Sequence, residues 1–263
     1  MISGLESARL KLDRAAVHIE AVRKAIGDYL SSEPGGIAKD ADGKYRLSFR
    51  KLPPPEAAVL AGEAIYQMRS ALDHLACDLV KLNPSNIQLP RDWVNDCQFP
   101  LRTKIPATKN ASRTLPLPYN SFARRLPGIS KEAFEFIEGM QPYYDRCDRE
   151  GSTQLLYLAK LSNIDKHRHL HVTKPRADVR YDWINGEGLH HCTTIRIENG
   201  ADVEIPVPKG AKVKAGFTPF VSFDESGLSE GETGLTVCGL LGFCLDGVER
   251  FIIPKFSELL KNP

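Results

Sequence analysis

The sequence has no Cys-x-x-Cys pair, and its six cysteines show none of the spacings typical of zinc sites. Its first residues lack the apolar core of a secretory signal peptide, so the thiols are expected to stay reduced. The longest apolar run, at residues 235–245, contains Thr236 and ends at Asp246, which is too short to span a membrane. These absences predict a cytoplasmic protein with no membrane partner.

Neither sign of charge dominates, because 35 Lys and Arg oppose 33 Asp and Glu and leave a net charge of +2. With 42% hydrophobic and 26% charged residues, the composition is that of a globular protein. A basic surface over the whole chain is excluded, so any nucleic-acid surface must be local. Residues 102–125 and 160–180 are locally basic, although such runs are more often solvated faces.

Several well-known catalytic and cofactor motifs are also absent. The chain has no G-x-G-x-x-G, no Walker lysine and no H-E-x-x-H. Dinucleotide binding, P-loop chemistry and a zinc-protease helix therefore have no support. No cofactor is predicted.

Apolar residues recur with helical spacing in five segments, at residues 4–31, 53–82, 131–140, 152–165 and 234–260. Pro-Gly-Gly follows the first segment and Asn-Pro follows the second, which are typical helix stops. Pro254 is expected to kink or restart the last helix.

Shorter segments predict strands. Residues 37–52 contain two of them around an Asp-Gly turn, which indicates a β-hairpin. Period-two patterns predict four more strands, at residues 168–173, 192–198, 203–207 and 219–223. The predicted fold class is α+β, a helical bundle core with a β-hairpin and a small antiparallel sheet.

We expect one unit over residues 1–263. It would comprise a mostly helical part at 1–165, which contains the hairpin at 37–52, and a β-rich insertion at 166–230. The C-terminal helix at 234–260 would then pack back on the core.

The second predicted helix carries Arg69 and His74 beside its apolar stripe. Arginine stays charged and recognises phosphate, whereas histidine transfers protons near neutral pH, so the pair points to phosphodiester chemistry. At about 100° per residue, His74 lies some 140° round the helix from Arg69. One helix does not readily aim both side chains at one phosphate, but two copies packed across a two-fold axis can.

The hexapeptide Arg-Ser-Ala-Leu-Asp-His, residues 69–74, has an R-x4-H spacing and resembles the catalytic motif of the HEPN superfamily. Four blocks also resemble an uncharacterised bacterial and phage-borne group: residues 69–75, Phe99-Pro100, Gln141-Pro142-Tyr143 and residues 163–168. Active HEPN members usually carry Asn, Asp or His after the arginine, where this chain has Ser70.

The resemblance implies a dimeric, metal-independent endoribonuclease of the toxin or phage-defence kind, with RNA as its partner. The ribose 2′-oxygen would attack the adjacent phosphate while His74 transfers the proton. Arg69 would stabilise the charge that develops on the phosphate oxygens. Ser70 and Asp73 are the neighbouring supporting residues.

Two other interpretations of this helix stay open. Asp73 follows Arg69 by four positions, so the two can form a structural ion pair worth about 0.3–0.5 kcal/mol. The chain can also be a non-catalytic protein that binds a nucleotide or RNA in a helical pocket.

A second polar block consists of Asp165, Lys166, His167 and Arg168. In the structural interpretation, its basic residues answer the negative end of the preceding helix dipole. In the functional one, Asp165 orients a histidine or arginine, and Lys166 and Arg168 bind RNA phosphates.

A third interpretation of this region is a metal-dependent hydrolase. On a strand, His167, His169 and His171 would point to one face, and neutral imidazoles suit zinc, copper or nickel. A catalytic zinc site usually adds a supporting carboxylate and an open position.

Overall fold

The computed structural model describes residues 3–84, 86–89, 91–103, 125–142, 151–167, 173–184, 190–197, 203–205, 212–223 and 235–261. The fold is α+β, as predicted. Its internal contacts divide the chain into two compact units. Unit 1 comprises Met1–Ile19, Gly62–His169 and Leu240–Pro263, and unit 2 comprises Glu20–Ala61 and Leu170–Gly239. Unit 2 thus takes residues 20–61 in addition to the predicted β-rich insertion.

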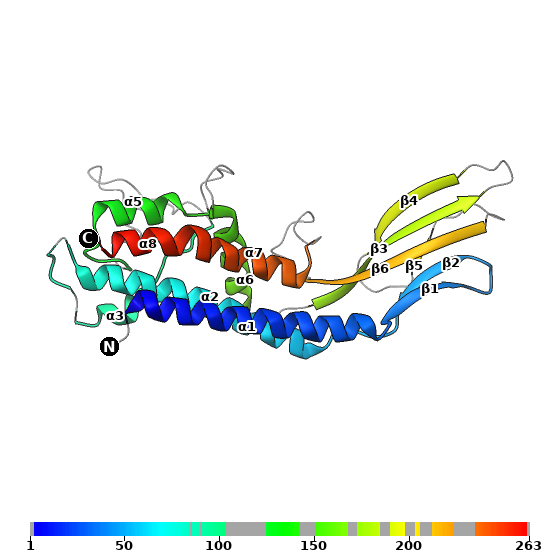
Figure 1. Cartoon of the computed structure of the whole chain (residues 1–263), viewed down its shortest axis with the longest axis horizontal. Helices are drawn as coiled ribbons and strands as arrows, with labels where there is room; N and C mark the ends of the chain where they lie inside the picture. The colour runs from blue at the N-terminus through cyan, green and yellow to red at the C-terminus, as the bar shows by residue number, and fades with distance from the viewer. Residues whose placement is uncertain are drawn as a thin grey trace. The chain divides into compact units, whose positions relative to one another are not determined.

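Two long helices, α1 (Gly4–Ser31) and α2 (Pro55–Leu82), lie side by side where both belong to unit 1 (Figure 1). They run antiparallel, because Ser7 contacts His74 and His18 contacts Glu63 across the pair. The apolar stripe predicted on α2 is buried: Ala61, Ile65, Met68, Leu72, Leu75 and Leu79. This buried stripe is what holds α2 in unit 1.

The remaining described helices are shorter than α1 and α2. They are α3 (Trp93–Asp96), α5 (Lys131–Gly139) and α6 (Ser152–His167), followed by α7 (Val237–Gly247), the π-helical turn η1 (Val248–Ile252) and α8 (Ile253–Leu259). Helix α5 lies beside α8 (Figure 1), where Lys255 Nζ is 3.1 Å from Glu132 Oε1. Pro254 occupies the first turn of α8 directly after η1, which is the predicted interruption.

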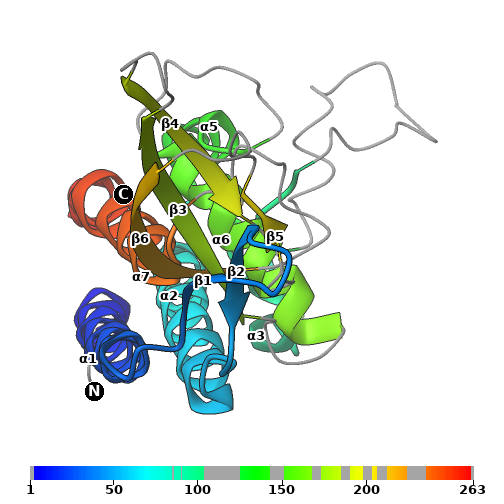
Figure 2. The same cartoon turned by 90° about the vertical axis from the view of Figure 1, so that its right-hand side faces the viewer.

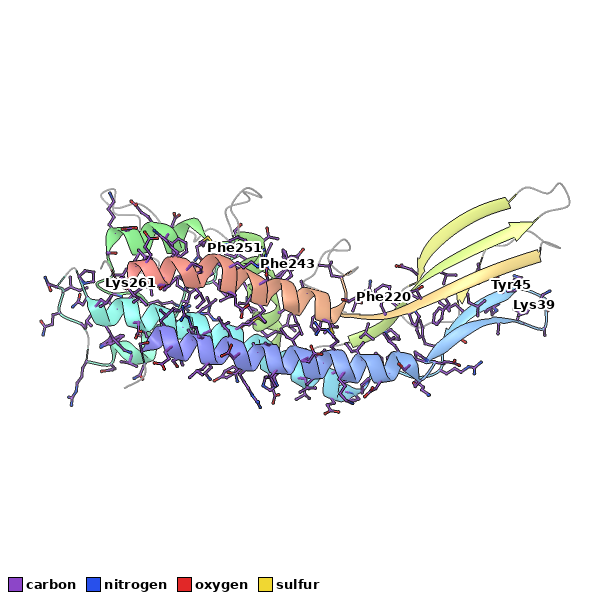
Figure 3. The ribbon with its side chains drawn as sticks, in the orientation of Figure 1. Lys39, Tyr45, Phe220, Phe243, Phe251 and Lys261 are labelled. Atoms are coloured by element: carbon purple, nitrogen blue, oxygen red, sulfur yellow. The ribbon has the colours of Figure 1, made fainter. Side chains whose placement is uncertain are left out.

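Unit 2 contains the predicted hairpin, formed by β1 (Gly35–Lys39) and β2 (Tyr45–Phe49) with Ile37 opposite Leu47. β5 (Val203–Glu204) adds to β2. Figure 3 shows Lys39 and Tyr45 together on the hairpin, where Lys39 Nζ lies 5.6 Å from the centre of the Tyr45 ring.

A second antiparallel sheet in unit 2 has the order β4-β3-β6 (Figure 2). Its strands are β3 (Thr173–Ile184), β4 (His190–Ile197) and β6 (Lys212–Phe223). The core of unit 2 joins residues of both sheets, namely Leu47, Ala177, Val179 and Ile205.

Of the strand predicted at residues 168–173, the structure describes Thr173, which is the first residue of β3, while residues 168–172 lie outside the described part of the chain. Helix α6 continues to His167. Most of β3 was missed although its polar and apolar residues alternate, because Pro175 argues against a strand interior. Among the described helices, none combines the length and the apolar character needed to cross a membrane.

Candidate functional site

Arg69 and Asp73 bind the two backbone polar groups of one residue, Phe99. The Arg69 guanidinium donates through Nη2 to the Phe99 carbonyl oxygen. Asp73 Oδ1 accepts from the Phe99 amide nitrogen at 2.9 Å and lies 3.0 Å from Arg69 Nη2. The predicted ion pair therefore exists, but it also fixes a chain segment 30 residues further along.

The other terminal nitrogen of Arg69, Nη1, is buried and has no hydrogen-bond partner among the described residues. The Arg69 side chain is only 8% exposed. Buried polar groups are nearly always paired, since an unpaired one loses its bonds to water without replacement. Nη1 is thus a donor that a bound ligand could satisfy.

A cavity of about 220 Å³ lies at Arg69. Three of its other lining residues, Ala159, Ser162 and Asn163, lie on α6. Gln98 and Leu101 come from the segment after α3, and Arg125 from the segment before α5. Guanidinium, amide and hydroxyl groups dominate this lining. The cavity is smaller than the roughly 300–1,000 Å³ of pockets for drug-sized ligands, so it suits a small polar group.

The charges at the cavity favour an anion. Burial lowers the pKa of the Arg69 guanidinium, Asp73 raises it, and the nearby positive charge of Arg125 lowers it further. Arginine nevertheless stays protonated in proteins. Among the described residues, the lining includes two guanidinium groups and no carboxylate, and Asp73 is the acidic side chain paired with Arg69.

Gln141 holds the following residues of the same segment. Its side chain is fully buried, and Nε2 donates to the carbonyl oxygens of Pro100 and Ile137, each at 2.9 Å. Its Oε1 accepts from the Arg102 amide at 3.1 Å. Arg69 and Asn163, from the first and last of the four sequence blocks described above, line the cavity. Phe99 is hydrogen-bonded to Arg69, and Pro100 to Gln141, so the other two blocks are linked to this region.

His74 lies elsewhere on α2. Its Nδ1 is 2.7 Å from Ser7 Oγ of α1, and the residue is not part of the cavity lining. Burial lowers the pKa of His74, with Lys11 lowering it further. Among the described residues that line the cavity, Arg69 is present and His74 is not, in keeping with the angle between them on the helix. Ser70 is half-buried on α2 and does not line the cavity either.

The second predicted polar block is only partly described. Asp165, Lys166 and His167 belong to the last turn of α6, and their side chains lie outside the description. Arg168, His169 and His171 lie outside the described residues altogether.

The strand arrangement expected for the three histidines is wrong for His167, because the helix has not yet ended there. Among the residues that the structure describes, no group of three or more His, Cys, Asp or Glu could hold a metal ion.

Sequence reasoning missed Gln98, Arg125 and Ser162 as members of the site. Arg125 belongs to the basic segment 102–125, which was interpreted mainly as a solvated face. The two adjacent arginines at positions 124 and 125 are the sequence feature that marks this site, but they do not indicate a contact with α2.

Comparison of the chain with protein-family models, with curated proteins and with solved structures found no match.

Proposed function

We propose that this protein binds a phosphate group of a nucleotide or of single-stranded RNA in the cavity at Arg69. The observation that carries the proposal is the unpaired Nη1 of a buried arginine beside a polar cavity that it shares with Arg125. Arginine recognises phosphate oxygens through its N–H donors. Nη2 already donates to Phe99, so Nη1 is the terminal nitrogen that remains for a phosphate oxygen.

Other features of the site support a phosphate ligand. Ser162 and Asn163 offer uncharged hydrogen-bonding groups at the same cavity, so several phosphate oxygens can be bound at once. Arg69 and Asp73 form a clamp on Phe99 through their hydrogen bonds to its carbonyl oxygen and amide nitrogen. This Phe99 clamp fixes the Arg69 side chain before a ligand arrives, which reduces the entropy lost on binding. The structural ion pair accounts for Nη2 but leaves Nη1 unexplained.

The test is a binding titration with a fluorescent single-stranded RNA oligonucleotide, repeated with a nucleoside monophosphate as competitor. Arg125→Ala removes one charged contact without touching the Phe99 clamp. We expect its dissociation constant to rise about ten- to hundredfold, since hydrogen bonds to charged groups contribute about 1.5–3 kcal/mol. Arg91→Ala is the matched control, because Arg91 is an exposed arginine that does not line the cavity.

Arg69→Lys provides an independent check. Lysine keeps the positive charge but lacks the planar fork, so it cannot serve Phe99 and a phosphate at once. We expect weaker binding together with a lower melting temperature, whereas Arg125→Ala should melt like the parent. Equal affinities of the parent and Arg125→Ala for both probes would remove the proposal.

A second candidate function is metal-independent RNA cleavage, as the resemblance to HEPN ribonucleases implies. The observation that favours it is His74, a half-buried histidine whose Nδ1 is held by Ser7. Because the pKa of His74 is lowered, its neutral form is available as a proton acceptor near pH 7. Since one chain does not bring His74 to the Arg69 cavity, this function requires a homodimer.

RNA incubated with the pure protein and a chelator tests this second function. The parent should release fragments that end in a cyclic phosphate, because the 2′-oxygen bonds to phosphorus as the 5′-oxygen leaves. His74→Ala should bind RNA as before but cleave at least about 10²-fold more slowly. Chelator-sensitive cleavage, or cleavage that persists in His74→Ala, would contradict it.

A further inference from the structure

Two cysteines contact each other close to the segment that Arg69 holds. Cys77 is on α2 and Cys97 follows the last residue of α3, and neither is in a disulfide. Cys77 Sγ lies 3.8 Å from the Cys97 carbonyl oxygen. Cys77 is half-buried and so within reach of a small solute, whereas Cys97 is only 5% exposed.

The two thiols differ in how readily each loses its proton. A side-chain hydrogen bond from Cys97 lowers the pKa of Cys77, against the opposing effects of burial and of Asp73. The same hydrogen bond and burial raise the pKa of Cys97. Cys77 is also the member of the pair that a peroxide can reach, because it is half-buried whereas Cys97 is buried, so Cys77 is the nucleophile of the pair.

We propose that Cys77 and Cys97 are an oxidisable pair that a hydroperoxide converts into an intramolecular disulfide. The Cys77 thiol releases its proton and the thiolate attacks the peroxide, so that an S–O bond forms and the O–O bond breaks. The leaving oxygen takes up the released proton and departs as water or alcohol. Cys97 sulfur then attacks the Cys77 sulfenic acid, so that the S–S bond forms and the S–O bond breaks. The released hydroxide takes the Cys97 proton and leaves as water, while the peroxide is the species reduced.

The disulfide has a consequence for the cavity, and this part of the inference rests on the proposed function. An S–S bond of about 2.05 Å draws Cys97 toward α2. The next two residues are Gln98, which lines the cavity, and Phe99, which Arg69 and Asp73 hold. Oxidation should therefore disturb the clamp and weaken phosphate binding, and reduction by a dithiol should restore it.

The experiment treats the reduced full-length protein with hydrogen peroxide, blocks the remaining thiols with N-ethylmaleimide and maps the peptides by mass spectrometry. We expect a Cys77–Cys97 cross-linked peptide that disappears in Cys77→Ser. In Cys97→Ser, Cys77 should instead be trapped as a dimedone adduct of its sulfenic acid. Cys238→Ser is the matched control, because Cys238 is also a half-buried free thiol but burial raises its pKa.

The outcomes separate this inference from the proposed function. A missing cross-link, or a dimedone adduct on Cys238 as fast as on Cys77, would overturn the oxidisable pair. If the cross-link forms while neither redox state binds the RNA oligonucleotide, the proposed function fails and the pair stands. If reduced protein binds and oxidised protein binds equally well, the link between the disulfide and the cavity is wrong.

Discussion

At the scale of single residues, the site depends on side chains that replace backbone partners. Phe99 and Arg102 lie in a segment without regular structure, so their amide nitrogens have no ladder to join. Asp73 and Gln141 accept from these two amides instead. The 99–102 segment is therefore held in place by Asp73 of α2 and by Gln141, which follows α5.

We predict that Gln141→Leu lowers the free energy of unfolding by about 3 kcal/mol, because each buried group left unpaired costs about 1–3 kcal/mol. Leucine has a similar volume but cannot make the hydrogen bonds of Gln141 to Pro100, Ile137 and Arg102. Urea unfolding followed by circular dichroism measures the change. Gln88→Leu, at an exposed glutamine, should be close to neutral, and an equal loss in both variants would show that the bonds are unimportant.

His74 makes a prediction about pH. Its pKa in the folded protein lies below the ordinary value of 6.5, so the unfolded chain binds more protons in the window between the two. The free energy of unfolding should therefore fall as the pH drops through 6.5, and the loss is complete below the folded pKa. His74→Asn should lose less stability over this window. Parallel slopes of the two proteins in urea titrations against pH would contradict this.

At the scale of elements, α2 combines two kinds of information. Its apolar stripe determines which face of the helix is buried. Its polar residues beside the stripe bind the neighbouring chain segments, because His74 contacts Ser7 of α1 and Arg69 donates to Phe99. The turn before α6 is equally specific. Gly151 has φ = +91°, a left-handed conformation that glycine adopts without strain.

Two glycines of unit 1 should respond oppositely to the same substitution. A Cβ on Gly151 would lie 2.7 Å from Met140 Cε, so Gly151→Ala should destabilise by about 1–3 kcal/mol through backbone strain and overpacking. A Cβ on Gly242, within α7, meets nothing within 4 Å. Gly242→Ala should therefore stabilise by about 0.5–1 kcal/mol. Thermal melts of both variants test the pair, and shifts of the same sign would refute the argument.

The same elements show what the sequence could and could not reveal. The long helices were predictable, because a stripe such as Ile65, Leu72 and Leu79 repeats with the helical period. The hairpin was predictable from its Asp-Gly turn. The cavity was not, because Arg125 and Gln98 come from segments without periodicity, and only tertiary contacts bring them to Arg69. The separation of Arg69 from His74 did follow from helix geometry alone.

At the scale of the whole molecule, the second candidate function requires two copies of the chain. In a dimer with composite sites, Arg69 would come from one copy and His74 from the other. We predict that Arg69→Ala and His74→Ala, each inactive alone, regain RNA cleavage when mixed, because a mixed dimer rebuilds one site. Activity should also fall steeply on dilution. If the mixture stays inactive while light scattering reports a dimer, the composite site is excluded.

The amides of Phe99 and Arg102 have a use of their own, since each donates to a side chain rather than to the backbone. Hydrogen exchange of each amide with deuterated solvent requires its bond to Asp73 or Gln141 to open. The two exchange rates therefore report how often these hydrogen bonds break. A bound anion would slow the Phe99 amide through Arg69, and the deuteration of this one peptide would then report occupancy without any label on the ligand.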